Sequence, residues 1–508
     1  MMVYDSMVMV YGSMVVFCGR TVLFYGGRMM VYGSFSFASY YADHMVLQQS
    51  PASPIIWGYA NSVGLPITVS MSGVNYDATS FEGPTGAALW SIQLDPQTTY
   101  GPVLIEATEA DCTIALNDVL FGDVYVCSGQ SNMEFRLDEI DNPDEEIADA
   151  INYPNVRTFM TELVYSDVPE YDLPGIARNW VVPTDDNMAQ FSALCWLFGR
   201  DLNVKFGYPI GLIKSAWGGT RIEAWSSPDA LQVCFPDGVP PGSSPANDPS
   251  ALWNAMIHPF LNMTIYGAIW YQGEANQDNY RDYGCAIQNM VGDWRTKWYD
   301  ATGGAMDVQF PFGQVQLAPN QDNDAETGFP DVRWAQTYNL GYTPNTYLER
   351  IYTAIALDLP DFDSPSGSIH PRYKRQIAVR MTYGAYQVAY GLTTEGPFQG
   401  PLPTSAVVEA DTVTITYDNG TANIEVRTQD NFELCCADAS TNRCPSDGVW
   451  TLAPITSNTA TSVTLSNPCG NFVTGMRYAW RESPCPLEMC AVYRVENQLP
   501  APPYVMDI

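Results

Sequence analysis

The stretch Gly122-Asp-Val-Tyr-Val-Cys-Ser-Gly-Gln-Ser131-Asn-Met-Glu134 decides the fold, because an apolar run leads directly into a glycine turn and a serine. The run at residues 124–127 has the unbroken hydrophobicity of a strand that is covered on both faces. Ser131 stands where a helix would begin, so its hydroxyl is expected at the carboxyl edge of a sheet, near the positive end of a helix. A developing oxyanion can be stabilised there, which makes serine hydrolase chemistry the leading hypothesis.

Further apolar runs occur at residues 210–213, 265–270, 310–317 and 354–357. Between them lie two stripes with helical spacing: Phe191, Leu194, Cys195, Phe198 and Leu202, and then Ile287, Val291, Trp294 and Trp298. Strands that alternate with helices predict a doubly wound, parallel α/β sheet. Ligands bind outside the carboxyl ends of the strands in such sheets, and Ser131, Gly219, Gln272 and residues 358–370 each follow a strand-like run.

The two flanks of the chain have a different pattern. Apolar and polar residues alternate between about residues 35 and 120, as at Ile67, Val69 and Met71, and alternation returns after residue 407. We therefore expect a β-sandwich at 35–120, a catalytic domain at 121–395 and a second β module at 396–508. Residues 1–34 contain an imperfect repeat without a clear cleavage site, so we interpret them as a leader or a degenerate N-terminal segment.

The histidines narrow the choice of a catalytic base, because the chain has only three, His44, His258 and His370. A serine nucleophile needs such a base. His370 lies in DLPDFDSPSGSIHPR (residues 358–372), which also offers carboxylates that could orient the imidazole. His44 and His258 lie in segments where a structural role is expected. His370 is therefore the predicted base.

Composition excludes several classes of partner. The formal net charge of -33 would repel phosphate backbones, so nucleic-acid binding is not expected. No apolar run is long enough to span a bilayer. The acidic run at residues 138–146 lacks the spacing of a calcium loop and is interpreted as a solvated surface. No metal and no cofactor are expected.

The cysteines and sequons indicate an oxidising compartment. Six of the twelve cysteines lie in the last quarter of the chain, where no histidine is near, which favours disulfides over zinc ligation. Cys127 and Cys195 lie in apolar segments and are predicted to be buried thiols. Asn262 and Asn419 match the glycosylation signal. Together these features predict a secreted or lysosomal glycoprotein.

Five motifs, taken in their order along the chain, resemble the sialate O-acetylesterase family of the SGNH hydrolase superfamily. They are SGQSNM (residues 128–133), IGLIKSAWGGTRIEAW (210–225), LWNAMIHP (252–259), WYQGEAN (270–276) and SIHPR (368–372). The similarity runs from about residue 43 to residue 503. It implies an SGNH-type doubly wound sheet, with β-sandwich modules at both ends, that hydrolyses acetyl esters through a serine nucleophile.

The resemblance implies a triad built on Ser131 and His370. Members of this superfamily commonly place an aspartate three residues before the histidine, but that position is Gly367 here. Asp363 is the first choice for the orienting acid and Asp358 the alternate, while Asp361 could also serve. Any of them would hold the imidazole tautomer if the loop brought it into reach.

The resemblance also implies an oxyanion hole. Its donors would be the backbone amides of Ser131 and Gly219 and a side chain in the WYQGEAN segment. Gln272 is the first choice for that side chain and Asn276 the alternate, whereas Glu274 is interpreted as a structural hydrogen-bonding residue.

The implied substrate is an O-acetylated sialic acid or sialoglycan. Its carboxylate would need a local cation, and Arg221 and Arg372 are neighbours of the site in sequence. Two alternatives remain open: an acetylesterase for another glycan, such as acetylated xylan, and a glycan-binding protein without catalysis. A glycosidase would need two facing carboxylates and no serine.

Overall fold

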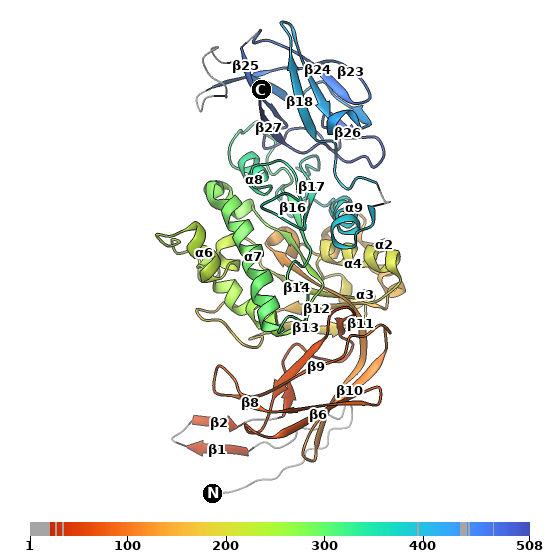
Figure 1. The fold of residues 1–508 in the computed structure, drawn as a ribbon, viewed down its shortest axis with the longest axis vertical. Coiled ribbons are helices and arrows are strands. Elements are labelled where there is room, and N and C mark those ends of the chain that lie inside the picture. Colours follow the sequence, from red (N-terminus) through yellow and green to blue (C-terminus); the bar gives the residue numbers. More distant parts are fainter. Residues whose placement is uncertain are drawn as a thin grey trace.

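The computed structural model describes residues 21–25, 28–32, 35–393, 396–436, 444, 448–470 and 472–508 of the chain. Most of the leader expected at residues 1–34 lies outside these described residues. Within it, β1 (Thr21–Tyr25) pairs antiparallel with β2 (Arg28–Tyr32). The described part is elongated, with β-rich regions at both ends and a mixed α/β region between them (Figure 1).

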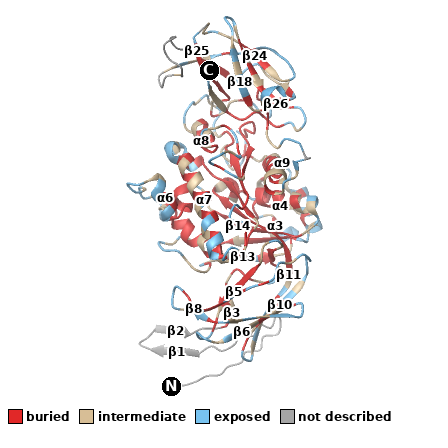
Figure 2. Ribbon diagram, viewed as in Figure 1, coloured by how far each residue is buried: buried red, intermediate tan, exposed pale blue. Residues whose placement is uncertain are grey.

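The central sheet contains parallel strands in the order β12, β14, β11, β15, β16, β17. The bounds are β11 (Cys112–Gly129), β12 (Val156–Thr161), β14 (Ile210–Ala216), β15 (Gly267–Tyr271), β16 (Phe312–Gln316) and β17 (Ile351–Ile355). The strand β13 (Ile176–Val181) pairs antiparallel with β12 at the edge. Every residue of β14 to β17 is buried, which explains the continuous apolar runs in the sequence (Figure 2).

Strands that follow β11 in the sequence are added first on one side of β11 and then on the other. The next parallel strand that pairs with β11 is β14 on one side, and β15 then pairs with it on the other. Such a reversal opens a crevice at the carboxyl end of the central strand, where the connecting segments diverge. Residue 131 follows directly after that end of β11.

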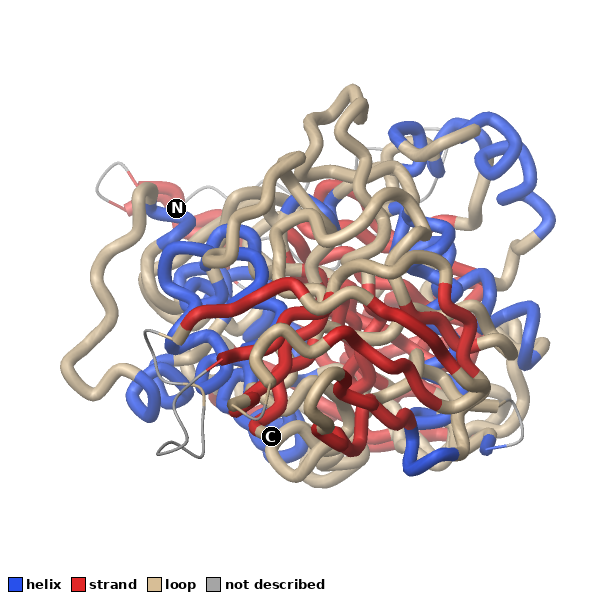
Figure 3. The backbone as a smooth tube through the Cα atoms, turned by 90° about the horizontal axis from the view of Figure 1, so that it is seen from above, coloured by secondary structure: helices blue, strands red, loops and turns tan. Residues whose placement is uncertain are grey.

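Helices cover both faces of the central sheet (Figures 1 and 3). On one side α4 (Ala193–Phe206) packs against α9 (Lys374–Gly384) and β14, and α7 (Tyr283–Ala301) lies on the other side with α6 (Pro228–Cys234). The predicted helical stripes lie on or beside α4 and on α7, so both helix predictions are confirmed. The shorter helices are α1 (Ser131–Glu134), α2 (Pro143–Asp149), α3 (Asp185–Met188), α5 (Ile222–Trp225) and α8 (Phe329–Ala335).

Two sheets form the N-terminal flank. One has the order β3 (Ser36–Phe37), β5 (Ile55–Tyr59), β9 (Ala88–Gln93), β8 (Phe81–Glu82). The other contains β7 (Val74–Thr79), β6 (Pro66–Met71), β10 (Val103–Glu109) and the first half of β11, onto which β4 (Val46–Gln48) also pairs. On β6 the residues Ile67, Val69 and Met71 are buried, which confirms the predicted alternation. Because β11 continues without a break into the central sheet, it joins the two regions.

The C-terminal flank contains further β sheets. The first has the order β18 (Pro403–Val408), β19 (Thr412–Tyr417), β24 (Ser462–Ser466), β23 (Ile455–Asn458), and the second β22 (Val449–Leu452), β21 (Phe432–Cys436), β25 (Val473–Tyr478), β27 (Tyr504–Asp507). The strands β20 (Ile424–Val426) and β26 (Val492–Arg494) pair separately. Ile355 and Leu357, at the end of β17, share the hydrophobic core of this flank. The C-terminal flank therefore packs on the carboxyl edge of the central sheet.

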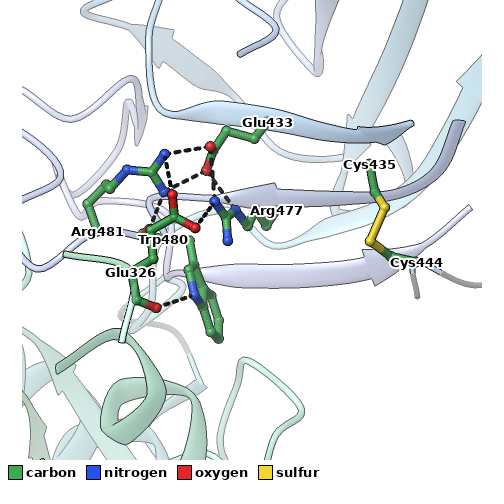
Figure 4. Close-up of polar contacts among 7 residues, drawn as sticks. All are labelled: Glu326, Glu433, Cys435, Cys444, Arg477, Trp480 and Arg481. Carbon is green, nitrogen blue, oxygen red and sulfur yellow. Dashed lines mark hydrogen bonds and ion pairs between the residues drawn. A yellow bond between two sulfur atoms is a disulfide. The ribbon is translucent and has the colours of Figure 1, made fainter. Parts of the chain in front are cut away.

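A charged cluster also fixes the C-terminal flank to the loop after β16 (Figure 4). Glu433 on β21 accepts hydrogen bonds from Arg477 at 2.7 Å and from Arg481 at 2.5 Å. Arg477 also donates to Glu326 of the loop at 2.6 Å, and the Trp480 indole donates to the Glu326 carbonyl at 3.1 Å. Guanidinium groups that bridge two carboxylates in this way constrain both partners.

The disulfides correct one prediction. Cys127 on β11 and Cys195 on α4, predicted to be free thiols, are joined to each other. Burial among apolar neighbours does not distinguish a thiol from a disulfide, and the packing of α4 against the sheet brings together two cysteines that are 68 positions apart. The disulfides predicted for the tail are confirmed: the pairs are Cys435–Cys444, Cys436–Cys469 and Cys485–Cys490. A further disulfide, Cys234–Cys285, links α6 to α7.

Candidate active site

Ser131 begins α1 immediately after the turn that ends β11. Gly129 has a φ of 136° and a Cβ there would lie 2.2 Å from the carbonyl oxygen of Tyr271, so only glycine fits. The Gln130 amide donates to the same carbonyl at 3.0 Å and fixes the turn to the end of β15. The first amides of a helix have no partner within that helix. The Ser131 amide and hydroxyl therefore lie at the carboxyl edge of the sheet, as predicted from the sequence.

The loop after β14 lies beside Ser131. A Cβ at Gly218 would be 3.2 Å from the Ser131 Cβ, and the Gly218 amide donates to Glu134 Oε2 at 2.8 Å. Glu134 is on α1, so this bond ties the loop to the helix that carries the serine. The next residue, Gly219, has a φ of 71°, and its amide donates no hydrogen bond within the described part of the chain. The amides of Ser131 and Gly219 are therefore available to an oxyanion.

The imidazole of His370 is held in one tautomer. Its Nδ1 lies 2.7 Å from the main-chain carbonyl oxygen of Ser366. Because a carbonyl oxygen only accepts hydrogen bonds, Nδ1 is the donor, and in the neutral ring the free lone pair lies on Nε2. Nε2 is buried and has no hydrogen-bond partner among the described residues. This nitrogen is ready to accept a proton.

Three contacts join the histidine loop to the serine helix and the residues that follow it. The side chain of Asn132 donates to the Ile369 carbonyl at 2.8 Å, and the rings of Phe135 and His370 are 6.3 Å apart between centroids. Ser366 Oγ is 3.1 Å from Glu139 Oε1. Asn132, next to Ser131, thus contacts Ile369, next to His370. The Ser131 hydroxyl does not itself bond Nε2 in this structure, and such bonds often tighten only when the substrate is bound.

None of the three candidate acids reaches His370. Asp363 is exposed and makes no hydrogen bond within the described part of the chain. Asp361 accepts two bonds of 2.7 Å from the Arg372 guanidinium, and Asp358 is fully buried against Arg380. The Ser366 carbonyl occupies the position that an aspartate holds in a triad.

Gly367 explains why the usual aspartate is missing. It has a φ of 90°, which favours glycine, and its carbonyl accepts the His370 amide at 2.8 Å. This turn folds the Ser366 carbonyl back onto the imidazole. A main-chain acceptor has no residue signature, so the only signal in the sequence was the absence of an aspartate at position 367.

We expect Asp363→Asn to leave kcat/KM for acetate release within about threefold of wild type, because its carboxylate does not contact the imidazole. Where an aspartate does orient the histidine, the same substitution lowers kcat by about 10⁴-fold. Steady-state kinetics on an acetylated substrate distinguish these results. A loss of about 100-fold or more would restore Asp363 to the triad.

Gln272 is less suited to the oxyanion hole than its sequence position suggested. It is fully buried, and its amide nitrogen donates to the Thr220 carbonyl at 3.2 Å and to Asn276 Oδ1 at 2.7 Å. Both of its protons are therefore used. The alternate, Asn276, accepts from the Ile222 amide at 3.0 Å and donates to Glu223 at 2.9 Å. In this structure both side chains support the loop that carries Gly219.

Two buried ionisable groups lie close to the site. Glu274, expected to be a structural hydrogen-bonding residue, accepts from Asn132 at 2.6 Å, and burial raises its pKa to about 7. Lys374, at the start of α9, donates to the other end of the Asn132 amide at 2.8 Å, and burial lowers its pKa to about 7. Asn132 and Lys374 have no signature in the sequence, because their role depends on contacts between distant segments.

The remaining candidates are held by other partners or lie outside the site. His44 Nδ1 is 2.7 Å from Asp118, and His258 Nδ1 is 2.8 Å from the Glu170 carbonyl, so each has the structural role that we predicted. The guanidinium of Arg221 donates to main-chain carbonyls. Of the two sequons, Asn419 is exposed and Asn262 is half-buried.

Within the described ranges, no cluster of three or more His, Cys, Asp or Glu side chains is arranged to hold a metal ion. No helix in that part of the chain has the length and hydrophobicity needed to cross a bilayer.

Known proteins resemble nearly the whole chain. Residues 121–347 match the family described as carbohydrate esterase, sialic acid-specific acetylesterase, and residues 404–508 match the sialate O-acetylesterase C-terminal domain. Sialate O-acetylesterase of Mus musculus is 39% identical over 528 residues, covering 93% of this chain and 94% of that protein. The Homo sapiens enzyme is 38% identical over 503 residues, covering 93% of each.

One solved structure also covers the whole fold. The crystal structure of a carbohydrate acetylesterase from Xanthomonas citri superimposes with a TM-score of 0.78 at 26% identity. The match covers 93% of this chain and 99% of that chain. The similarity therefore includes both flanks as well as the central sheet.

Proposed function

The chain belongs to the sialate O-acetylesterase family of carbohydrate esterases, and we propose that it removes O-acetyl groups from sialic acids through an acetyl-enzyme on Ser131. It is a carboxylic ester hydrolase. The observation that carries the serine mechanism is the buried Nε2 of His370, which has no hydrogen-bond partner among the described residues and lies on the loop that contacts the serine helix.

In the first half-reaction, Ser131 Oγ attacks the acetyl carbonyl carbon while Nε2 of His370 takes the hydroxyl proton. The negative charge that develops on the carbonyl oxygen is stabilised by the amides of Ser131 and Gly219. The tetrahedral intermediate collapses, the bond to the sugar oxygen breaks, and the imidazolium returns its proton to that oxygen. The products are a free sugar hydroxyl and an acetylated serine.

In the second half-reaction, water replaces the sugar. Nε2 takes a proton from water, the resulting nucleophile attacks the acetyl-serine, and the intermediate releases acetate as Ser131 recovers its proton. The Ser366 carbonyl holds the Nδ1 proton throughout and stabilises the imidazolium that forms in each half-reaction. No metal or cofactor takes part in this scheme.

We also propose the finer architecture and the compartment. An SGNH-type doubly wound sheet is supported by the order of the strands across the sheet, which is β14, β11, β15, β16, β17. The proposed division into modules at 35–120, 121–395 and 396–508 is supported by the change from antiparallel to parallel pairing along β11 and by the separate sheets of the C-terminal flank. Disulfides in the central and C-terminal regions, together with the sequons at Asn262 and Asn419, support secretion or a lysosomal location.

The test of the substrate compares acetate release from a 9-O-acetylated sialic acid, from the same sugar with its carboxylate converted to an amide, and from acetylated xylan. We expect kcat/KM to be highest for the sialic acid and to fall about 10- to 100-fold for the amide, as for the loss of one hydrogen bond to a charged group. Activity on xylan alone would favour the alternative of a neutral-glycan acetylesterase. The similarity to the Xanthomonas citri carbohydrate acetylesterase is consistent with that alternative. Binding of the sialic acid without any acetate release would favour a non-catalytic glycan-binding protein.

A further inference from the structure

The side chain of Asn132 connects three parts of the site. Its amide nitrogen donates to the Ile369 carbonyl at 2.8 Å and to Glu274 Oε1 at 2.6 Å, and its oxygen accepts from Lys374 Nζ at 2.8 Å. Asn132 is 1% exposed, so these contacts are shielded from bulk solvent. Both protons of the amide and its oxygen are thus committed to fixed positions.

Lys374 holds the other side of the histidine. Its ammonium group donates to the Pro371 carbonyl at 2.5 Å and lies 4.2 Å from the centroid of the Phe135 ring. The side chain is fully buried. The main-chain carbonyls that precede and follow His370 are therefore each held by a buried side chain, and these two side chains bond to each other.

We propose that Asn132 and Lys374 are positioning residues, which lock the backbone on either side of His370 to the helix that carries Ser131. This inference rests on the proposed serine mechanism. Rotation of the imidazole is restricted by Ser366, but the Ser366 bond does not fix the loop relative to the serine. The contacts of Asn132 and Lys374 fix the loop relative to the serine, because Asn132 is the residue after the nucleophile.

The cost of burying charged groups indicates that the network around Asn132 and Lys374 positions the histidine loop rather than stabilises the fold. Burying an ammonium group and a carboxyl group costs free energy, and apolar residues of similar size often stabilise a fold as well or better. One oxygen of Glu274, Oε2, is buried and has no hydrogen-bond partner in the described part of the chain, so the network is not optimised for stability. What the polar groups provide, and apolar groups could not, is two directed hydrogen bonds to the carbonyls beside His370.

The first experiment measures kinetics on an acetylated substrate with Asn132→Ala and Lys374→Met. We expect kcat to fall about 10- to 100-fold with KM within about twofold, because a displacement of about 1 Å at the reacting groups has an effect of this size. Lys297→Met is the matched control. Lys297 is half-buried and paired with Asp293 on α7 and Asp229 on α6, away from the residues of the site, and its loss should leave both constants unchanged.

A variant that avoids an unpaired buried charge separates positioning from folding. Lys374→Met combined with Glu274→Gln removes both ionisable groups and keeps an acceptor for the Asn132 amide, so the protein should fold while the Pro371 contact is lost. We expect the same fall in kcat as in Lys374→Met. Unfolding in urea, measured in parallel, reports whether the variant retains the stability of wild type.

The second readout does not depend on activity. With only three histidines, the imidazole nitrogen resonances can be assigned, and His44 and His258 serve as internal references with partners outside the site. We expect the His370 Nδ1–H signal to shift or broaden in both variants of Lys374 while the other two signals stay in place. A folded double variant with kcat within twofold of wild type and an unchanged His370 signal would overturn the inference. Full acetate release by Ser131→Ala would instead overturn the serine mechanism.

Discussion

Ser131→Ala and His370→Ala are each expected to lower kcat/KM for acetate release by about 10⁴-fold or more, and the double variant should be no worse than either alone by more than about threefold. The two side chains act as one unit, since the hydroxyl is a poor nucleophile until Nε2 takes its proton. Once one member is removed, the other has nothing to act on. The remaining activity should reflect the amides of Ser131 and Gly219, which neither substitution removes.

Covalent labelling distinguishes the two roles. A fluorophosphonate should modify wild-type protein on the peptide that contains Ser131, react much more slowly with His370→Ala and leave Ser131→Ala unlabelled. Urea unfolding of each variant controls for stability. If the single losses multiplied in the double variant, the two residues would act independently and the proposed proton transfer would be wrong.

The sequence was a good guide to the fold because each prediction depended on local patterns. Continuous apolar runs marked the buried strands β14 to β17, and the stripe on α7 marked a helix packed against the sheet. Ser131 could be placed at the sheet edge for the same reason, since a glycine turn after a buried strand has few conformations open to it. These inferences did not require knowledge of which distant segments meet.

The predictions that failed or fell short all depended on contacts between distant segments of the chain. Cys127 and Cys195 come within bonding distance only when α4 packs on the sheet. Gln272 follows a strand as expected, but its two protons are taken by Thr220 and Asn276, a competition that spacing cannot reveal. The Ser366 carbonyl replaces an acid on His370 because of the turn at Gly367, and a main-chain atom leaves no trace in the residue types.

Asp358 shows how a carboxylate in the right loop can have a different purpose. Its two oxygens accept bonds of 2.5 Å and 3.0 Å from Arg380 on α9, and the Tyr493 hydroxyl of the C-terminal flank donates to it at 2.9 Å. Its carbonyl accepts the Glu488 amide at 2.8 Å. Asp358 therefore joins the end of β17, α9 and the C-terminal flank in one buried cluster.

Asp358→Ala is consequently expected to lower the free energy of unfolding by about 3 to 5 kcal/mol, because it leaves the Arg380 guanidinium buried without its counter-ion. Tyr493→Phe should cost only about 1 to 2 kcal/mol, since the ion pair remains. Replacing both charges, as in Asp358→Leu with Arg380→Met, should cost less than the sum of the single losses, because no unpaired charge is left. Urea unfolding followed by tryptophan fluorescence measures all of these differences.

Activity assays on the folded fraction distinguish a structural role of Asp358 from a role as the triad acid. At a temperature where Asp358→Ala stays folded, kcat/KM should fall by less than about tenfold, because its carboxylate supports the histidine loop without contacting His370. A triad acid would give the opposite pattern, with stability nearly unchanged and kcat/KM lower by about 10⁴-fold. That second outcome would mean that the histidine loop rearranges around Asp358 during catalysis and that the Ser366 carbonyl holds His370 only in the resting enzyme.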